Sequence, residues 1–327
     1  MAATESDKLI TSGRYEIYNT GHPQEDYFNM YRIDDKSDLK EAVLYVDYKT
    51  NILEHNMAAA GREAGCGFSK SFVESFLCSD GLPISLSNKY LGDETMRKET
   101  ANRDPRLKQL ILTNDFPTNV TDDLKDSTFV VNEDEFITQH CFTGYRPIKG
   151  FNPIYSQALY MKSSFDGIAY RYAETLLINA EAKAELNTIT NADLDRTVNQ
   201  LRDRVGMPHL TVNVGFTDPK WPDWGYSLSP ILQEIRRERC IELAGEGFRF
   251  NDLKRWKAGK VLNNVLTYVG KRKPDGNLAI VYPNYTNPDL SYQAGKSRTW
   301  EDKMYLYPIP TGELQRNPQL LPQNPGW

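Results

Sequence analysis

The sequence predicts a mainly α-helical fold, in which antiparallel helical hairpins are joined by long irregular loops and a few short β-strands. Apolar residues recur at helical spacing through 168–206 and again through 230–256. The flanking stretches contain turn residues and short alternating runs instead. We therefore expect one domain made of an irregular, short-strand region at 1–165, a helical core at 166–258 and a loop-rich closing region at 259–327.

Two stretches of the first region have a recognisable local pattern. Residues 42–48 alternate apolar and polar side chains, which is typical of a half-buried strand. Residues 68–77 predict a short amphipathic helix, and the following Ser-Asp-Gly-Leu-Pro sequence at 79–83 predicts its end and a turn.

The clearest helical pattern lies at 168–206. One face recurs at spacings of four, three, four and four residues, through Ala169, Ala173, Leu176, Ala180 and Ala184. Residues 187–191 break this pattern, residues 194–205 resume it, and Gly206 with Pro208 ends it. Two such helices predict an antiparallel hairpin, the unit of tetratricopeptide-type arrays, and one hairpin cannot cover its own apolar faces.

A third helix is expected from residue 230. Ser229 can cap it and Pro230 suits its first turn. Gly245 and Gly247 interrupt the pattern, so residues 248–256 predict a second, shorter helix. In the closing region, residues 273–276 predict a turn and residues 279–282 a returning strand.

The third helix and its successor carry charges of both signs among apolar residues. Glu238 and Glu242 lie four apart, where like charges repel unless a cation comes between them. The arginines nearest in sequence are the candidates for that cation. We therefore predict a half-buried structural ionic network of Arg239, Glu242, Glu246, Arg249, Asp252 and Arg255.

Composition excludes several classes of protein. The formal net charge of −5, without a basic patch, argues against a nucleic-acid partner. The four cysteines, Cys66, Cys78, Cys141 and Cys240, show neither Cys-x-x-Cys spacing nor a nearby histidine cluster, so neither a zinc site nor any other cofactor is expected. A Cys66–Cys78 disulfide stays an open alternative. The polar first thirty residues predict neither a signal peptide nor a membrane span.

Four ordered motifs resemble the SusD/RagB family. They are residues 235–256, the alanine-rich 170–186, the Asn-Arg-Asp-Pro-Arg sequence at 102–106, and the closing segments 306–310, 317–318 and 323–327. The resemblance covers roughly the whole chain and implies the larger, C-terminal part of a SusD-like domain that lacks its N-terminal portion. We interpret 102–106 as a structural clamp, with docking as the alternative.

The resemblance implies a function as well as a fold. Members of the family are surface lipoproteins of the outer membrane that capture nutrients, mostly glycans, and pass them to a SusC-like TonB-dependent transporter. It also implies that membrane contact is made through a lipid anchor, whose signal sequence and cysteine are not found in this sequence. Ligand contacts in the family lie in variable loops outside the four motifs, so no ligand-binding residue carries over.

Local composition therefore supplies the candidate site residues. The 215–226 loop holds Trp221, Asp223, Trp224 and Tyr226 among turn formers, where exposed rings can stack on sugars and carboxylates can accept hydroxyl hydrogen bonds. The alternative is that one tryptophan anchors the loop to the helices beneath it. A second candidate set combines aromatic and polar residues at Tyr282, Tyr285, Asn287, Tyr292 and Trp300.

Catalysis is not expected. Glu238 and Glu242 are the best carboxylate pair, but two side chains on one helical face do not flank a cleft, as a glycosidase requires. The sequence also lacks the local motifs of hydrolases and phosphate-binding enzymes. The function predicted is non-catalytic glycan binding. Capture of peptides or other nutrients, a glycoside hydrolase that uses Glu238 and Glu242, and a helical-repeat scaffold remain as alternatives.

Overall fold

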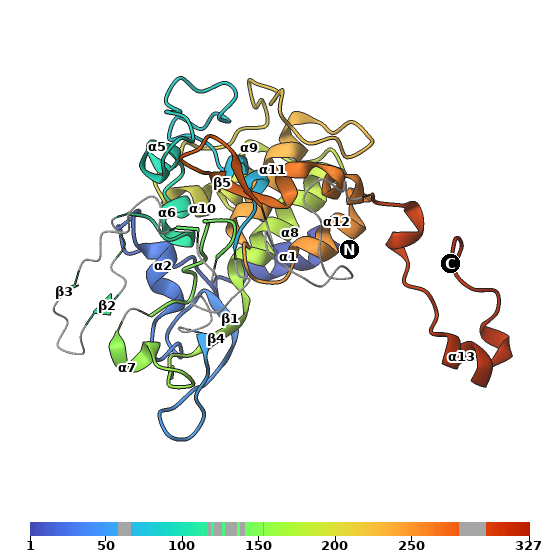
Figure 1. Cartoon of the computed structure of the whole chain (residues 1–327), viewed down its shortest axis with the longest axis horizontal. Helices are drawn as coiled ribbons and strands as arrows, with labels where there is room; N and C mark the ends of the chain where they lie inside the picture. Colours follow the sequence, from blue (N-terminus) through green and yellow to red (C-terminus); the bar gives the residue numbers. More distant parts are fainter. Residues whose placement is uncertain are drawn as a thin grey trace.

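Helix α8, Tyr172–Glu185, is the central helix of the structure (Figure 1). The computed structural model describes residues 1–57, 67–114, 116, 119–120, 126–127, 136–137, 141–152, 154–280 and 299–327. The buried face of α8 carries Ala173, Ala180 and Ala184 beside two leucines. Because these alanines are small, α1, Ala2–Thr11, and α11, Pro230–Glu242, pack directly against α8.

Helix α1 lies in the region that we expected to be irregular. It is attached to α8 by polar contacts: buried Asn179 donates from Nδ2 to Ala3 O at 3.2 Å and to Ser6 Oγ at 3.0 Å. Lys183 of α8 also forms an ion pair with Asp7 at 3.0 Å. The prediction missed α1 because these contacts need no apolar stripe in its sequence.

The helix predicted from residue 169 begins only at Tyr172. Ala169 belongs to strand β4, Gly167–Arg171, which pairs antiparallel with β1, Ala42–Val46. The strand predicted at 42–48 is thereby confirmed. Ala42 pairs with Arg171, so a partner far away in the sequence overrides the helical periodicity at the start of this segment.

The second helix of the predicted hairpin is divided in two. Helices α9, Asn191–Asp195, and α10, Val198–Arg204, are separated at residues 196–197. A capping box between Thr190 and Asp193 fixes the start of α9, and Gly206 with φ +65° follows α10. Helix α10 contacts α8, as the hairpin predicts, but α1 and α11 cover more of α8 than α10 does.

Helices α11 and α12, Arg249–Arg255, follow the predicted division. Gly245 and Gly247 separate them with φ values of +75° and +85°, which glycine adopts without steric cost. Pro230 occupies the first turn of α11 as predicted. The predicted cap is wrong, because the Ser229 side chain makes no capping hydrogen bond.

The other described elements are short. Helix α4, Lys70–Ser75, confirms the helix predicted at 68–77, and a turn joins β5, Val269–Arg272, to β6, Leu278–Ile280. Each sheet in the described part of the chain has two antiparallel strands. The remaining elements are α2 (Asp26–Tyr31), α5 (Met96–Thr100), α6 (Arg106–Leu110), β2 (Asn119–Val120), β3 (Asp126–Ser127), α7 (Tyr155–Ala158), η2 (Gly259–Asn263) and η3 (Val265–Thr267). This mainly helical, loop-rich architecture confirms the predicted fold class.

Buried apolar side chains gather in three clusters of the described chain. One lies around α2, α4 and α6, and a second joins α8 to α10 and α11. A smaller third cluster contains Trp224, Leu253, Trp256, Ala258 and Val261. No helix among the described residues is long and apolar enough to cross a bilayer.

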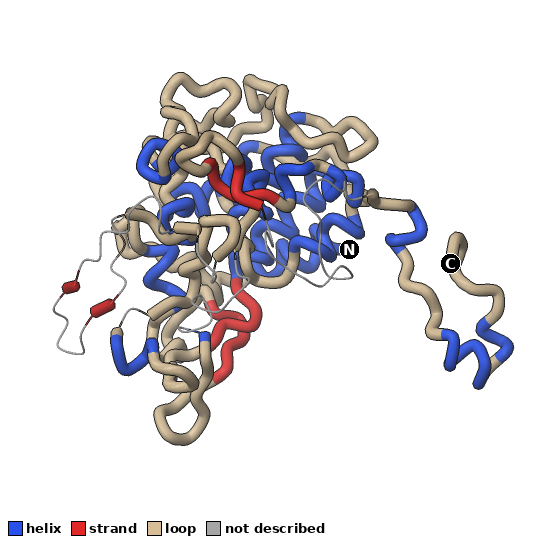
Figure 2. Tube along the Cα trace, viewed as in Figure 1, coloured by secondary structure: helices blue, strands red, loops and turns tan. Residues whose placement is uncertain are grey.

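Residues 299–327 form a C-terminal arm that extends away from the rest of the molecule (Figure 2). The arm contains η4 (Asp302–Tyr305), α13 (Thr311–Arg316) and η5 (Pro318–Leu320). Near its base, Gly259 N donates to Tyr305 Oη at 2.8 Å and Lys254 Nζ lies 3.9 Å from the Tyr307 ring centroid. At its end, Trp327 Nε1 donates back to Leu306 O at 2.9 Å.

Candidate functional site

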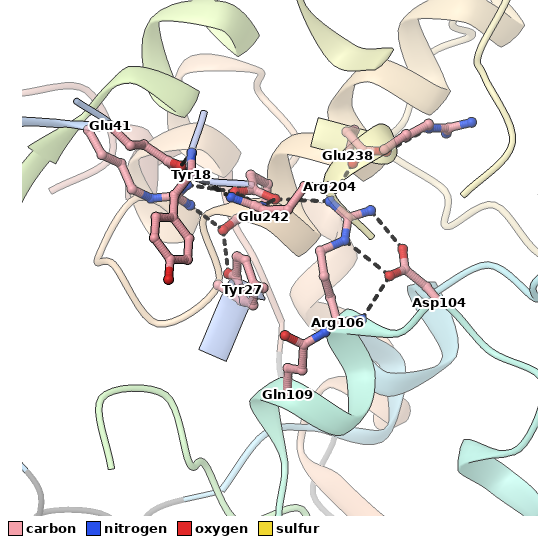
Figure 3. A network of polar contacts seen from close by, with 12 residues as sticks. Tyr18, Tyr27, Glu41, Asp104, Arg106, Gln109, Arg204, Glu238 and Glu242 are labelled. Carbon is pink, nitrogen blue, oxygen red and sulfur yellow. Dashed lines mark hydrogen bonds and ion pairs between the residues drawn. The ribbon is translucent and has the colours of Figure 1, made fainter. Parts of the chain in front are cut away.

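A buried ionic network surrounds the C-terminal end of α11 (Figure 3). Glu242 is fully buried and accepts hydrogen bonds from Arg204 Nη2 at 2.6 Å, Arg171 Nη1 at 2.6 Å and Arg106 Nη1 at 3.0 Å. Arg106 Nη1 also pairs with Glu238. One guanidinium therefore lies between the two carboxylates that would repel each other along α11.

The cations that neutralise Glu238 and Glu242 differ from those predicted. We expected them from arginines next to the pair in sequence, but they come from Arg106 and from three arginines on other segments: Arg171, Arg202 and Arg204. Sequence reasoning cannot find such partners, because the tertiary fold alone brings them to α11.

The predicted six-residue network is split between two places. Glu246 joins Glu242 through Arg171 and pairs with Lys149 at 2.6 Å. Elsewhere, Asp252 bridges Arg239 at 2.9 Å and Arg255 at 2.8 Å. The sixth member, Arg249, differs from the prediction: its exposed side chain has no hydrogen bond or ion pair with any described residue.

The network is suited to a structural role. Burial by itself would raise the pKa of Glu242, but Arg204, Arg171 and Arg106 hold this pKa well below its ordinary value. The carboxylate thus stays ionised, out of contact with solvent, and cannot act as a general acid.

The 102–106 motif acts as the predicted clamp. Buried Arg103 donates to the carbonyl oxygens of Val73 at 2.8 Å, Phe76 at 2.9 Å and Glu99 at 3.0 Å. Arg106, from the same motif, reaches α11. The motif therefore joins α4, α5 and α11.

A cavity of about 630 Å³ lies on the other side of α11. Its lining comes from α4, the 218–224 segment, α11, α12, η2 and η3. The size falls within the range of about 300–1,000 Å³ that is usual for small-ligand sites. Exposed Lys220, Arg249 and Phe250 belong to the lining, so the cavity reaches the surface.

Three tryptophans lie in a row beside this cavity. The ring centroids of Trp221 and Trp224 are 5.4 Å apart, and those of Trp224 and Trp256 are also 5.4 Å apart. Arginines of α11 lie over the row, with Arg237 5.1 Å from the Trp221 centroid and Arg236 4.6 Å from the Trp256 centroid. The row thereby places the 215–226 loop on α11.

Other parts of the lining contain aromatic residues that sequence reasoning did not propose as site residues. Phe68 and Phe72 stack with centroids 4.5 Å apart, and both line the cavity. Phe248 and Phe250 line it from the segment that begins α12. The spacing of Phe68, Phe72 and Phe76 was a usable signal, since aromatic residues four apart share one helical face.

The first predicted loop contributes one residue of the expected kind. Trp221 is partly exposed and lines the cavity. The expected exposure of Trp224 is wrong: it is 3% exposed and stacks on Trp256, so it anchors the loop. Asp223 is exposed and accepts from Gly225 N at 2.7 Å. The Tyr226 hydroxyl donates to Trp256 O at the end of α12, so this polar group is already occupied within the protein.

The second predicted set is mostly outside the described residues. Tyr282, Tyr285, Asn287 and Tyr292 all lie there, and Trp300 alone is described. The Trp300 ring lies against Gly259, where an added Cβ would come within 2.1 Å of it. Phe250, which lines the cavity, lies 6.4 Å, centroid to centroid, from Trp300.

The described side chains do not assemble a metal site. Within the part of the chain that the structure covers, no three His, Cys, Asp or Glu residues are grouped so that they could hold an ion. Cys78, Cys141 and Cys240 are free thiols, which leaves Cys78 outside any disulfide.

Fold and site together define a helical, loop-rich protein with an aromatic-lined surface cavity. The SusD family model matches residues 14–327, and the chain belongs to this family. It is 32% identical over 166 residues to SusD-like protein P2 of Formosa agariphila, an alignment that covers 51% of this chain and 27% of that protein.

Solved structures show the same fold. A SusD-like protein from Bacteroides fragilis superposes with a TM-score of 0.67 at 25% identity, covering 99% of this chain and 61% of that one. A SusD-like carbohydrate binding protein from the same organism gives a TM-score of 0.63 at 23% identity, covering 98% of this chain and 60% of that one. The chain thus spans less than two thirds of the length of these relatives.

Proposed function

We propose that this chain binds oligo- or polysaccharides at the cell surface, without cleaving them, and delivers them to a partner TonB-dependent transporter. The observation that carries the proposal is the partly exposed Trp221 ring in an aromatic-lined cavity of about 630 Å³. Proteins of this family are typically associated with the outer membrane at the cell surface. Membership of the family supports the location and the transporter partner.

The lining of the cavity suits a sugar ligand. Aromatic rings present flat apolar faces to the C–H groups of a sugar ring, and nearby hydroxyl and amide groups can bond its hydroxyls. The lining offers Trp221, Phe68 and Phe250 for the first role, and Ser71 and Asn264 for the second. Individual contacts of this kind are weak, so a longer glycan should bind better than a monosaccharide.

We propose binding without cleavage because the best carboxylate pair of the chain is buried and forms ion pairs with arginine. Glu238 and Glu242 are 2% and 0% exposed, and both form ion pairs with Arg106. A glycosidase needs one protonated and one accessible carboxyl group on opposite sides of a cleft. Glu238 and Glu242 are inaccessible and lie on one face of α11, so the pair cannot flank a cleft.

Affinity gel electrophoresis against plant, host and microbial polysaccharides tests the glycan-binding role. The variant is Trp221→Ala, and the matched control is Tyr160→Ala, which removes a 73% exposed ring outside the cavity lining. We expect Trp221→Ala to weaken binding by about tenfold or more, since a stacking face is lost. The control should bind like the parent.

Other outcomes discriminate between the alternatives. If the Trp221→Ala variant binds glycans as well as the parent does, the glycan-binding function would stand, but the site would lie outside this cavity. A folded parent that binds no glycan would overturn the proposal and favour peptide capture or a scaffold role. Co-purification of a TonB-dependent transporter, identified by mass spectrometry, tests the partner separately.

A further inference from the structure

The charged residues around the cavity are unevenly distributed. Five cationic side chains line it, against three carboxylates: Lys220, Arg236, Arg237, Arg239 and Arg249 against Glu74, Asp218 and Asp252. The whole chain carries a formal net charge of −5, so the excess of cationic side chains in the cavity lining is opposite in sign to the net charge of the chain. A cavity lined by an excess of one sign of charge raises the local concentration of ligands of the opposite sign.

Three of these arginines form ion pairs within the protein. Arg237 pairs with Asp218 at 2.7 Å, Arg239 pairs with Asp252 at 2.9 Å, and Arg236 pairs with Glu185, which lies outside the lining. Their charges are largely neutralised by these partners. These three arginines therefore contribute to the shape of the cavity but little to its net charge.

Lys220 and Arg249 are different. Both side chains are exposed, both line the cavity, and neither forms a hydrogen bond or ion pair with another described residue. The Arg249 guanidinium carbon lies 5.9 Å from the Trp256 ring centroid, at the end of the tryptophan row. A planar guanidinium without a carboxylate partner offers paired N–H donors to an anionic ligand.

Arg239 is enclosed and has two carboxylate partners, Asp252 at 2.9 Å and Glu174 at 3.8 Å. Arg239 is 5% exposed, it shares Asp252 with Arg255, and its Nη1 has no hydrogen-bond partner among the described residues. Because Nη1 is enclosed, it makes no direct contact with a ligand, and Arg239 stays among the internally paired arginines.

Among the carboxylates of the lining, Glu74 is the one that would repel an anionic ligand. Its side chain is 23% exposed, and the nearest cation is Lys70 Nζ at 3.8 Å. Lys70 also pairs with Asp93 and Glu99, at 2.8 and 2.5 Å. Burial raises the pKa of Glu74 above its ordinary value, although Lys70 and Lys220 act against this.

We propose that the cavity takes an acidic glycan unit, with Arg249 and Lys220 recognising its anionic substituent and Trp221 stacking on a sugar ring. The inference rests on the proposed glycan-binding function and narrows its substrate class. A uronic-acid carboxylate and a sulfate ester supply the same chemistry to a guanidinium, so the test includes both.

Isothermal titration calorimetry with matched pairs of oligosaccharides tests whether the ligand is an acidic glycan. One pair is oligogalacturonate and its methyl ester, which differ in charge on one backbone. The other is a sulfated galactan oligosaccharide and its unsulfated form. We expect the acidic member of at least one pair to bind about fivefold or more tightly, and this preference to shrink as salt is added.

Two substitutions test whether the preference for the acidic glycan arises in the cavity. Arg249→Gln should weaken binding of the acidic glycan about fivefold and leave binding of its neutral partner unchanged. Glu74→Gln should strengthen binding of the acidic glycan, because it removes the opposing charge. Lys257→Gln is the matched control, since Lys257 is an exposed cation just after α12 and outside the lining.

Each remaining outcome has a definite meaning. Equal binding of acidic and neutral members overturns the inference and leaves glycan binding intact. An acidic preference that survives Arg249→Gln also overturns it, because the charge would then be recognised elsewhere. If the folded chain binds no member of either pair and nothing in the wider polysaccharide panel, the inference and the proposed function fail together.

Discussion

At the residue scale, Glu242 shows how one carboxylate can hold distant segments together. It is 0% exposed and receives hydrogen bonds from Arg106, Arg171 and Arg204, which lie on α6, at the end of β4 and on α10. Removing a charge from such a cluster is costly, since buried guanidinium groups lose the anion that compensates them.

Glu242→Gln should therefore lower the free energy of unfolding by about 3–5 kcal/mol. Urea denaturation followed by circular dichroism measures the change. Glu313→Gln is the control, because Glu313 forms an exposed pair with Arg316, and it should shift the midpoint too little to resolve. A Glu242 variant as stable as the parent would show that the network adds no net stability.

Glu246 makes stability depend on pH. Burial by itself would raise its pKa, but Arg171 and Lys149 lower the pKa to about 2, below the ordinary value of 4.5. Because the folded pKa is the lower one, the stabilisation is fully present above pH 4.5 and is lost as pH falls toward 2.

We expect Glu246→Gln to be less stable than the parent at about pH 6, and the gap to narrow by about pH 3. Urea unfolding of both proteins across this range measures the gap. The same gap at every pH would mean that Glu246 acts through packing and not through its charge.

At the element scale, strand β5 packs on the 141–144 turn through a glycine. Lys271 N donates to Thr143 O at 2.8 Å, and a Cβ on Gly270 would lie 2.0 Å from that oxygen. The neighbouring atoms are backbone and cannot move aside as a side chain could. Gly270 therefore allows β5 to approach this closely.

Gly270→Ala should destabilise the protein by about 1–3 kcal/mol through overpacking. Thermal unfolding checks this against Gly312→Ala, a helical position in α13 where an added Cβ meets nothing within 4 Å. The control should be neutral or slightly stabilising, because alanine favours helix. Equal melting temperatures for the two variants would contradict the predicted clash.

At the scale of the whole molecule, the C-terminal arm, residues 299–327, extends away from the helical part and is largely exposed. Leu306, Tyr307 and Leu321 are more than half exposed, at 53%, 68% and 58%. The hydrogen bonds at the far end, such as those of Trp327, run back to other residues of the arm. Opening the arm should thus cost little free energy compared with unfolding the helical part.

Trypsin should cut after Arg316, whose side chain is 79% exposed, before it cuts after Arg255 in α12. A digestion time course followed by mass spectrometry measures the order of cleavage. An arm that outlasts the helical part would show that another surface covers it in solution.

The sequence predicted the elements whose pattern is local. Residues 68–77, 230–242 and 248–256 contained helices as expected, because their spacing and their glycine and proline signals act within a few residues. Helix α1 and strand β4 were missed or misassigned. Both depend on partners elsewhere, namely Asn179 on α8 and the strand β1.

The candidate site was predicted only in part for the same reason. Composition drew attention to the 215–226 loop, and Trp221 does line a cavity. Composition could not distinguish Trp221 from Trp224, because burial of Trp224 depends on Trp256, thirty-two residues farther along the chain. The aromatic wall at Phe68 and Phe72 reaches the same cavity from still farther away.

By itself, the sequence determined the helical class, the family and the need for a cation beside Glu238 and Glu242. The tertiary structure alone decided which cation: Arg106 lies 136 residues from Glu242 in sequence, yet their side chains are 3.0 Å apart. It likewise left Arg249, at the cavity, without an ion-pair partner among the described residues. Helical periodicity and turn signals arise from neighbours along the chain, whereas charge pairing and cavity shape depend on how distant segments pack.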